Sequence, residues 1–590
     1  MKFRSLRQWE NLEELAGLAF FAQLLEELLF DYSLDTYKPS AMNSSSLCVE
    51  ALDLITDIED EVIDHANLSH VLGELILNLR KDEVVHSLVD FDLEHAHSTM
   101  LNKVAPLHEK KVIVELIHSQ INLSKYKEKN EELLVDAVNN GREKNRIRSL
   151  TRSYVTTIIT LGYSTQYLYA SSMQTFHRDG QKIGSPDDIR NFFDIAKGNT
   201  VEYVAIFKAS QIFSEISESC KKFDIKISKS IDHYLEPHVQ TKNFRAHGGE
   251  VYLVFDKVKA LDVYSARESA ERLLDRLSAL TNIFHHKQVP TWSKVALLVN
   301  KESNISRVIP SSRNPMHMCN DKRTKDAADH LYRFIEDFTL GEAYSFQKYS
   351  RAVDLHALAL KSDSPENQLL NLWVALETIT PSKLSGNKAK VNKIIDSTLP
   401  FLSLNYIHAL TDRLLLDFKL WNREILGEAI DGVSGQTERE RLIRILVLAK
   451  HDDRKRSLYR SLKDFHLLRN RAHYFSEVLS STEKIVRVLE NNWTRVDWQV
   501  RRIYRARNQI VHAGHTPLYI NVLIKNIHDY LDVVLGSIAN LASREDKINT
   551  IDQAYKYTQL LHVEYMNELK GGSVETTEEN VHRVIIRRRI

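Results

Sequence analysis

Apolar residues recur at helical spacing through the first 150 residues of the chain. Segments 12–30 (LEELAGLAFFAQLLEELLF), 70–91 (HVLGELILNLRKDEVVHSLVDF) and 110–123 (KKVIVELIHSQINL) repeatedly place them three and four positions apart. This spacing gathers apolar side chains on one face of a helix. We therefore predict a helical N-terminal region over residues 1–150.

The pattern changes after residue 150, where β-branched and aromatic residues gather in short runs typical of strands. Two helix starts are also marked, by Ser185 before a proline and by the capping box of Ser265 and Glu268. Residues 151–300 are therefore expected to form an α+β domain. The predicted strands are 153–161 (SYVTTIITL), 164–172 (STQYLYASS), 201–208 (VEYVAIFK), 250–258 (EVYLVFDKV) and 292–300 (WSKVALLVN).

The chain becomes polar and broken between Asn300 and Asp329, and helical spacing returns beyond that segment. We assign a linker to 301–334, a helical bundle to 335–570, and a basic tail to 571–590 that begins flexible and ends in a β-prone piece. The predicted fold class is mostly α with a central α+β region.

Composition agrees with a helical chain of several domains. At 590 residues the chain is too long for one hydrophobic core. It has 18 glycines and 11 prolines, and a low content of these helix breakers favours helices. Basic and acidic residues both total 79, so any nucleic-acid surface has to be a local patch.

The cysteines and the N-terminus indicate the compartment. Cys48, Cys220 and Cys319 lie far apart without a CxxC pair, which argues against a disulfide framework or a thiolate metal site. The most apolar N-terminal run is interrupted by Gln23 and two glutamates, so it is too polar to span a bilayer. We therefore expect a cytoplasmic protein with no membrane association.

The stretch 504–514 (YRARNQIVHAG) gathers polar groups that are suited to catalysis. On a straight helix Asn508 and His512 share a face, because they are four residues apart. Arg507 is aligned instead with an apolar stripe that contains Ile510, where a guanidinium needs a paired partner. We therefore expect Arg507 to contact a carboxylate or a phosphate.

These side chains suit metal-free cleavage of RNA. A histidine can take the proton of a ribose 2′-OH, or protonate the leaving oxygen, near neutral pH. An arginine can stabilise the charge that develops on the phosphate. His512 and Arg507 are the candidates for these roles and Asn508 can orient either, while Arg501 and Arg505 lie on the same side of the helix as His512.

The motif and its surroundings resemble the C-terminal half of HEPN domains, in particular the Apea-like HEPN group. In HEPN proteins an arginine, four to six residues and a histidine mark the ribonuclease motif, often as R-N-x-x-x-H, which matches Arg507, Asn508 and His512. The W-x-A-L-E core of 366–380 (ENQLLNLWVALETIT) is similar to the first core helix of the group. The resemblance covers residues 335–568 and implies a HEPN-type helical bundle there.

The resemblance also implies a function. In an endoribonuclease of this kind the substrate's 2′-OH attacks the adjacent phosphorus, which leaves a 2′,3′-cyclic phosphate or 3′-phosphate without a metal or cofactor. The family pattern places an acidic residue of the first core helix, here Glu377, near Arg507 and His512. HEPN nucleases generally act as dimers, so a homodimer with a composite site is implied.

The Apea-like group is associated with bacterial antiphage defence through abortive infection. By this analogy the chain is expected to be a toxic effector, controlled by a sensor region that precedes the bundle and released by a phage-derived trigger.

A second basic segment precedes the motif. Residues 466–475 (HLLRNRAHYF) contain Arg469, Asn470 and His473, one residue short of the R-N-x-x-x-H spacing. We interpret this segment as a basic surface that could hold an RNA backbone, with a solvated helix face as the alternative. The predicted RNA-binding residues are Arg454, Arg456, Arg469, Arg471, Arg501 and Arg505.

Other functions stay open. A HEPN-like bundle could bind RNA or nucleotides, or act as an assembly module, without cleaving. A nucleotide-modifying enzyme in the α+β region is a third hypothesis, but the paired acids of 184–188 (GSPDD) fall in a helix turn rather than on a strand. No metal ligands are assigned, since the alternation of metal-capable side chains in DFDLEHAH matches no standard zinc pattern; these are Asp90, Asp92, Glu94, His95 and His97.

Overall fold

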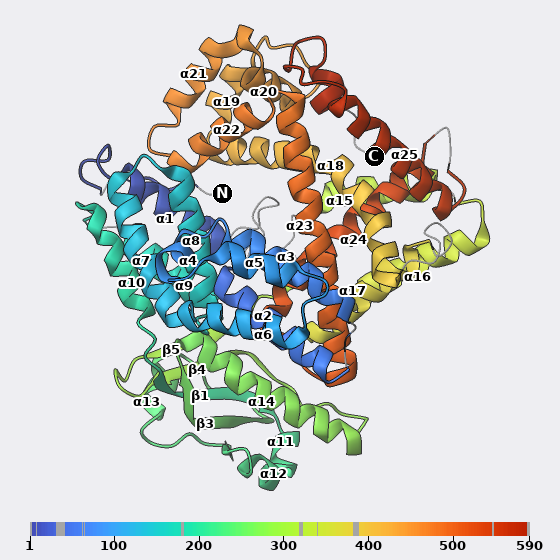
Figure 1. The fold of residues 1–590 in the computed structure, drawn as a ribbon. Helices are drawn as coiled ribbons and strands as arrows, with labels where there is room; N and C mark the ends of the chain where they lie inside the picture. The colour runs from blue at the N-terminus through green and yellow to red at the C-terminus, as the bar shows by residue number, and fades with distance from the viewer. Residues whose placement is uncertain are drawn as a thin grey trace. The chain divides into compact units, whose positions relative to one another are not determined.

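The structure, a computed structural model, is mostly helical with one five-stranded sheet, which confirms the predicted fold class (Figure 1). The chain divides into two compact units. The helical unit contains Met1–Thr157, Lys182–Asp187 and Asn314–Ile590, and the sheet unit contains Ile158–Gln181 and Asp188–Arg313. The residues that the structure describes are 3–6, 9–30, 42–61, 63, 65–178, 182–317, 323–338, 340–381, 389–544 and 548–586.

The sheet is antiparallel throughout, with the strand order β2-β3-β1-β4-β5. β1, β3 and β4 lie where the sequence predicted strands. β2 and β5 were not predicted because they are only four and five residues long, and β5 lies inside the expected linker. The strands are β1 (Val201–Ser210), β2 (Ile225–Ser228), β3 (Glu250–Ala260), β4 (Trp292–Asn300) and β5 (Ser306–Pro310).

Both faces of the central strands are covered, which explains their nearly continuous apolar sequences. Phe207 of β1 belongs to a core with Leu274 of α14, and its neighbour Ile206 belongs to a second core with Val239 of α13. The helices between residues 165 and 284 are α9 (Thr165–Phe176), α10 (Arg190–Phe193), α11 (Ile212–Glu215), α12 (Ser217–Lys221), α13 (Glu236–Thr241) and α14 (Val263–Phe284), with 3-10 turns η2 (Pro186–Ile189) and η3 (Asp194–Ala196).

Two of the predicted strands are helices. Residues 153–161 fall almost entirely in α8 (Lys144–Thr160), and residues 164–172 fall in α9. The buried side chains of Ile147, Tyr154 and Ile158 follow helical spacing along α8. This stripe outweighs the strand preference of a few consecutive β-branched residues.

Side-chain caps set the starts of the neighbouring helices. Ser164 accepts a backbone N–H three residues on and starts α9. Asp262, rather than the predicted Ser265, caps α14, and it accepts the backbone N–H of Ser265 at 2.9 Å. Ser185 accepts a backbone N–H at the start of the 3-10 turn η2, not of an α-helix.

The N-terminal part of the helical unit consists of short, closely packed helices. α1 and α7 approach so closely that a Cβ on Gly17 would lie 2.2 Å from the carbonyl oxygen of Val138. The elements are α1 (Ala16–Phe30), α2 (Ser44–Glu59), η1 (His65–Asn67), α3 (Leu68–Leu79), α4 (Glu83–Leu88), α5 (Leu93–Leu101), α6 (Leu107–Gln120) and α7 (Leu123–Asn140).

The C-terminal part is a bundle with one large apolar core. Trp373 of α17, Ile503 of α23 and Leu531 of α24 are each at most 1% exposed within it. The helices are α15 (Thr324–Asp337), α16 (Ala343–Lys361), α17 (Pro365–Ile379), α18 (Lys390–Trp421), α19 (Arg423–Ile430), α20 (Glu438–Val447), α21 (Asp452–Ser461), α22 (His466–Val478), α23 (Thr482–Asn508), α24 (Ile520–Ala542) and α25 (Ile551–Lys570), with the 3-10 turns η4 (Pro315–His317) and η5 (Ala449–His451).

The expected linker and tail are more structured than predicted. β5, η4 and the start of α15 occupy much of 301–334, although Cys319 lies outside the described residues. In the tail the backbone of Val574 accepts the N–H of Thr482 at 3.0 Å, and the π-turn η7 (His582–Ile586) buries apolar side chains. Within the described residues no helix has the length and apolarity needed to cross a membrane.

Candidate active site

The R-N-x-x-x-H stretch lies at the end of α23, where the helix widens into a π-turn, η6 (Gln509–Ala513). Gly514 closes the turn at φ +63°, and its N–H donates to the carbonyl of Gln509. In an α-helix, residues five apart diverge by roughly 140° around the axis. A π-turn holds more residues per turn, so it brings Arg507 and His512 closer to one face than an α-helix would.

Arg507 is half-buried, and its guanidinium has free donor capacity. Its Nη1 donates to Oδ1 of the adjacent Asn508 at 2.9 Å. Its buried Nε has no hydrogen-bond partner among the described residues. The expected carboxylate partner for Arg507 is therefore absent from the described part of the chain, and the buried Nε–H is left without a hydrogen bond there.

His512 is exposed on η6, next to Val511, which is 47% exposed. Among the described residues its imidazole has no side-chain partner, so a substrate can approach it. The turn ends in a left-handed glycine, a conformation that costs glycine little and other residues more. Gly514 therefore allows the chain to leave the helix directly after the histidine.

The predicted role of Glu377 does not match its contacts. Its carboxylate accepts the indole N–H of Trp373 at 3.1 Å and pairs with Lys390, rather than with Arg507 or His512. α17 does pack on α23 as expected, because the ring of Trp373 lies 5.6 Å from that of Tyr504, one turn before the motif. Glu377 therefore stabilises the packing of α17 on α23 indirectly, by holding the indole of Trp373 one helical turn earlier on α17.

The turn is fixed by residues that the sequence did not single out. Nε2 of Gln509 donates to Asp57 of α2 at 2.9 Å, and Oγ1 of Thr516 donates to Glu366 of α17 at 3.0 Å. Partial burial and the negative charge of Asp57 raise the pKa of Asp53, while His515 opposes this rise. Two helices distant in sequence thus hold the segment that carries His512.

A buried ion-pair network also locks α23 to the N-terminal helices. Glu50 of α2 accepts from Nε and Nη2 of Arg502, at 2.8 and 2.7 Å, and from Nη2 of Arg505 at 2.6 Å. Glu74 of α3 accepts from Arg502 at 2.6 Å. All four side chains are at most 9% exposed. The prediction that Arg505 contacts RNA is therefore wrong for this structure.

Electrostatics distinguish the two glutamates of this network. Burial favours the neutral form of Glu50, but the guanidiniums of Arg502 and Arg505 outweigh it and lower its pKa to about 2. Glu74 contacts one arginine and lies near Glu50, so burial raises its pKa despite the attraction of Arg502. The charged carboxylate of Glu50 therefore supplies the main electrostatic attraction to Arg502 and Arg505.

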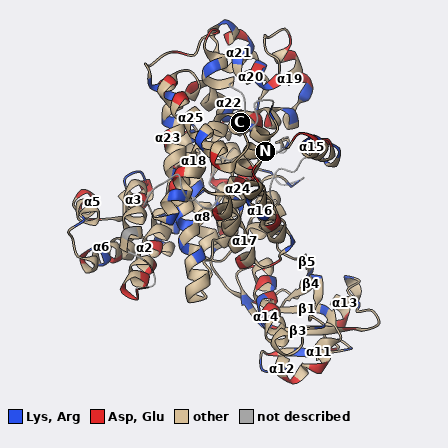
Figure 2. Cartoon of the chain, turned by 90° about the vertical axis from the view of Figure 1, so that its right-hand side faces the viewer, with Lys and Arg blue, Asp and Glu red and all other residues tan. Residues whose placement is uncertain are grey.

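The other predicted RNA-binding arginines are mostly engaged. Arg471 is 7% exposed and pairs with Glu27 and Asp417, so its interpretation as part of a basic surface was wrong. Around α19, α20 and α21, basic and acidic positions are interspersed (Figure 2). The remaining contacts are Arg501 with Asp497 and Asn392, Arg454 with the carbonyls of Ala429 and Asp431, Arg456 with Asp453, and Arg469 with His466.

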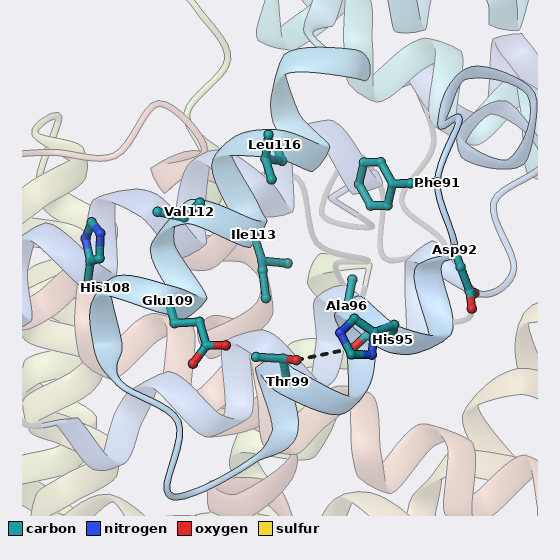
Figure 3. Close-up of a pocket in the computed structure, with 10 residues that line it drawn as sticks. All are labelled: Phe91, Asp92, His95, Ala96, Thr99, His108, Glu109, Val112, Ile113 and Leu116. Carbon is teal, nitrogen blue, oxygen red and sulfur yellow. Dashed lines mark hydrogen bonds between the residues drawn. The ribbon is translucent and has the colours of Figure 1, made fainter.

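A separate cavity of about 620 Å³ lies between α5 and α6 and includes part of the DFDLEHAH segment. Its ionisable side chains do not converge, because Asp92 and His108 lie at opposite ends (Figure 3). His97 is buried outside the lining, and burial lowers its pKa. Among the described residues, no three metal-capable side chains of this lining are grouped closely enough to share an ion. The cavity is lined by Phe91, Asp92, His95, Ala96, Thr99, His108, Glu109, Val112, Ile113 and Leu116.

Comparison with known proteins found no matching family model, curated protein or solved structure.

Proposed function

We propose that the protein is a metal-independent endoribonuclease with a HEPN-type active site at the end of α23. The observation that carries the proposal is the arrangement around η6. An exposed His512 follows, on a widened turn, a half-buried Arg507 whose Nε lacks a partner among the described residues. Arginine and histidine in this arrangement suit phosphodiester chemistry.

In the proposed reaction the ribose 2′-oxygen attacks the adjacent phosphorus, and the bond from phosphorus to the 5′-oxygen breaks. A base takes the proton of the 2′-OH and an acid protonates the leaving 5′-oxygen. His512 performs one of these transfers. Arg507 donates to a non-bridging phosphate oxygen, and Asn508 holds its guanidinium in place. The products are a 2′,3′-cyclic phosphate and a 5′-OH.

A homodimer would complete this site. The reaction needs a proton acceptor and a proton donor, and each copy of the motif supplies one histidine. A second copy of η6 facing the same RNA would supply the other group. The substrate is therefore proposed to bind between two copies of the chain, which makes the active site composite.

The buried network supports control by the N-terminal helices. Glu50 and Glu74 fix α23 through Arg502, five residues before Arg507, and Glu50 also holds Arg505. Gln509 of the turn itself is held by Asp57. We propose that these contacts restrain a toxic nuclease of bacterial antiphage defence, acting in the cytoplasm by abortive infection. A phage-derived trigger would loosen them.

A second candidate is a non-catalytic HEPN protein that binds RNA or nucleotides. It is favoured by the contacts of Glu377, which engages Trp373 and Lys390 instead of the motif. The two candidates differ in whether RNA is cut.

The deciding experiment incubates the full chain with total cellular RNA in EDTA and maps the cut ends. The variants are His512→Ala, the matched control His473→Ala, which removes an exposed histidine from the near-motif on α22, and Glu50→Gln, which weakens the proposed restraint. We expect cyclic-phosphate ends from the wild type or from Glu50→Gln, with no loss in His473→Ala.

In the double variant Glu50→Gln/His512→Ala these cuts should disappear. Cuts that survive removal of His512 would overturn the assignment. RNA that stays bound to the protein but is never cut, even by Glu50→Gln, would support the second candidate, a non-catalytic RNA-binding protein.

A further inference from the structure

α16 and α24 run antiparallel along one seam of the bundle. The hydroxyl of Tyr349 on α16 donates to the carbonyl of Leu535 on α24 at 3.3 Å. Seven residues after Tyr349 comes His356, and seven residues before Leu535 comes His528. Because seven residues are about two helical turns, the same seam that joins the first pair brings the two histidines together.

Three side chains with metal-binding atoms meet at this point. Nε2 of His356 lies 3.2 Å from Oδ1 of Asp532, and Nε2 of His528 lies 3.4 Å from Oδ2 of the same carboxylate. The imidazole centroids are 4.9 Å apart. One ligand atom from each of the three residues lies within 4.8 Å of the others, the one such group found among the described residues.

The two nitrogen–oxygen separations, 3.2 and 3.4 Å, are close to those between neighbouring ligands of a tetrahedral metal, and they involve different oxygens of the Asp532 carboxylate. Zinc with bonds of about 2.0–2.1 Å to nitrogen and oxygen holds its ligand atoms about 3.3–3.4 Å apart. Two histidines and one carboxylate are also a ligand set that zinc accepts. His528 and Asp532 are four residues apart on one helix, which is a spacing that directs two ligands to one point.

The environment of His356 argues for a ligand rather than for a simple ion pair. Among the described residues its buried Nε2 has no hydrogen-bond partner, although Oδ1 of Asp532 lies 3.2 Å away. A buried nitrogen without a partner is costly, and a bound cation would satisfy it. The Asp532 side chain is 47% exposed, so a fourth, solvent-facing position is left for water.

We propose that His356, His528 and Asp532 bind one zinc ion, which joins α16 to α24. The sequence did not reveal this site because the third ligand comes from a helix far from the His-x-x-x-Asp pair. None of the three residues belongs to the R-N-x-x-x-H motif, and the site is independent of the proposed nuclease, which needs no metal.

The test uses the full chain after removal of metal with a chelator and dialysis. Zinc binding is measured by calorimetry and by the shift of the melting temperature, and Co²⁺ is used as a spectroscopic probe. We expect one equivalent of zinc per chain, a raised melting temperature, and the intense visible absorption of four-coordinate Co²⁺.

Two variants should lose the site. Asp532→Ala removes a half-exposed side chain, so the fold should be retained, and His356→Gln replaces a partly exposed ligand. Each should weaken zinc affinity by about tenfold or more, since one of three protein ligands is lost. The control His285→Ala/His286→Ala, an exposed histidine pair in the other unit, should bind zinc like the wild type.

The proposal is overturned if the wild type binds no stoichiometric zinc, or if binding survives in Asp532→Ala/His356→Gln. Because the readouts are metal binding and melting temperature, they are unaffected by the outcome of RNA cleavage in EDTA.

Discussion

Replacing Glu50 by glutamine tests the lock between the N-terminal helices and α23. The substitution keeps the side chain's size and removes its charge. Arg502 retains Glu74 as a partner, whereas Arg505 loses its carboxylate contact with Glu50, which was 2.6 Å long. In Glu50→Gln the buried guanidinium of Arg505 therefore has no charged hydrogen-bond partner among the described residues.

The magnitude follows from the structure in two ways. A pKa of Glu50 lowered from 4.5 to about 2 corresponds to about 3 kcal/mol in favour of the charged form. Removing one partner of a buried ion pair typically costs about 3–5 kcal/mol. We therefore expect the equilibrium for opening α2 away from α23 to rise by about 100-fold or more, since about 1.4 kcal/mol is a factor of ten.

The assay is hydrogen exchange at neutral pH, read by mass spectrometry on peptides from α2 and α3, because local opening controls amide protection. Glu59→Gln is the matched control, since Glu59 ends the same helix and pairs with Lys111 at the surface, where a pair contributes about 0–1 kcal/mol. Glu74→Gln should have a smaller effect than Glu50→Gln, because burial already disfavours the charge of Glu74.

The reasoning is refuted if Glu50→Gln exchanges no faster than Glu59→Gln in these peptides. The pH dependence gives a second check. The folded-state pKa of Glu50 is depressed, so its stabilisation is present above pH 4.5 and is lost as pH falls through about 2.

Two further predictions concern packing and pH. Gly17→Ala should lower the melting temperature, because the new Cβ would meet Val138 at 2.2 Å, whereas Gly73→Ala, a helical position with open space, should raise stability by about 0.5–1 kcal/mol. The opposite result for Gly17→Ala would mean that α1 and α7 are not in close contact. Burial, with the positive charge of Arg469 beside it, lowers the pKa of His466 to about 3. Protonation of this histidine therefore favours the unfolded chain, and the free energy of unfolding should fall from pH 6.5 downwards, by about 2 kcal/mol at pH 5. Urea unfolding at pH 7 and at pH 5 measures this change in the free energy of unfolding. The variant His466→Gln should lose less stability between pH 7 and pH 5 than the wild type.

Helices and strands were largely predictable where a single regular pattern of apolar residues continued over a long segment. The N-terminal and C-terminal helices followed from helical spacing, and the three longer strands followed from their runs of β-branched and aromatic residues. The sequence failed at 153–172, where a few β-branched residues suggested strands. The helical stripe of α8 begins upstream of that run, at Ile147, so a window limited to the run could not detect it.

The contacts that fix the candidate site to the N-terminal helices were less predictable, because they join residues 452 positions apart in the sequence. Gln23 and Glu27 seemed to interrupt an apolar helix, yet both are buried and contact α22, Glu27 through Arg471 and Gln23 through the backbone of Leu467. Buried polar residues need partners, so glutamates on the apolar faces of α1 and α2 were a signal that arginines elsewhere would meet them.

The widening of the helix at η6 had no equivalent signal. Gly514 marks the end of the helix, but nothing in the residues 509–513 distinguishes a π-turn from an α-turn. The angle between Arg507 and His512 could therefore not be obtained from an ideal helix.

The long sequence separation within the buried network has a consequence for synthesis on the ribosome. Glu50 is made 452 residues before Arg502. At about 5–20 residues per second, the N-terminal helices emerge roughly 20–90 seconds before the motif helix is complete. For the proposed nuclease, the restraining surface is thus already present when Arg507 and His512 leave the exit tunnel. Under the proposed function, the motif would therefore never be synthesised ahead of the helices that restrain it.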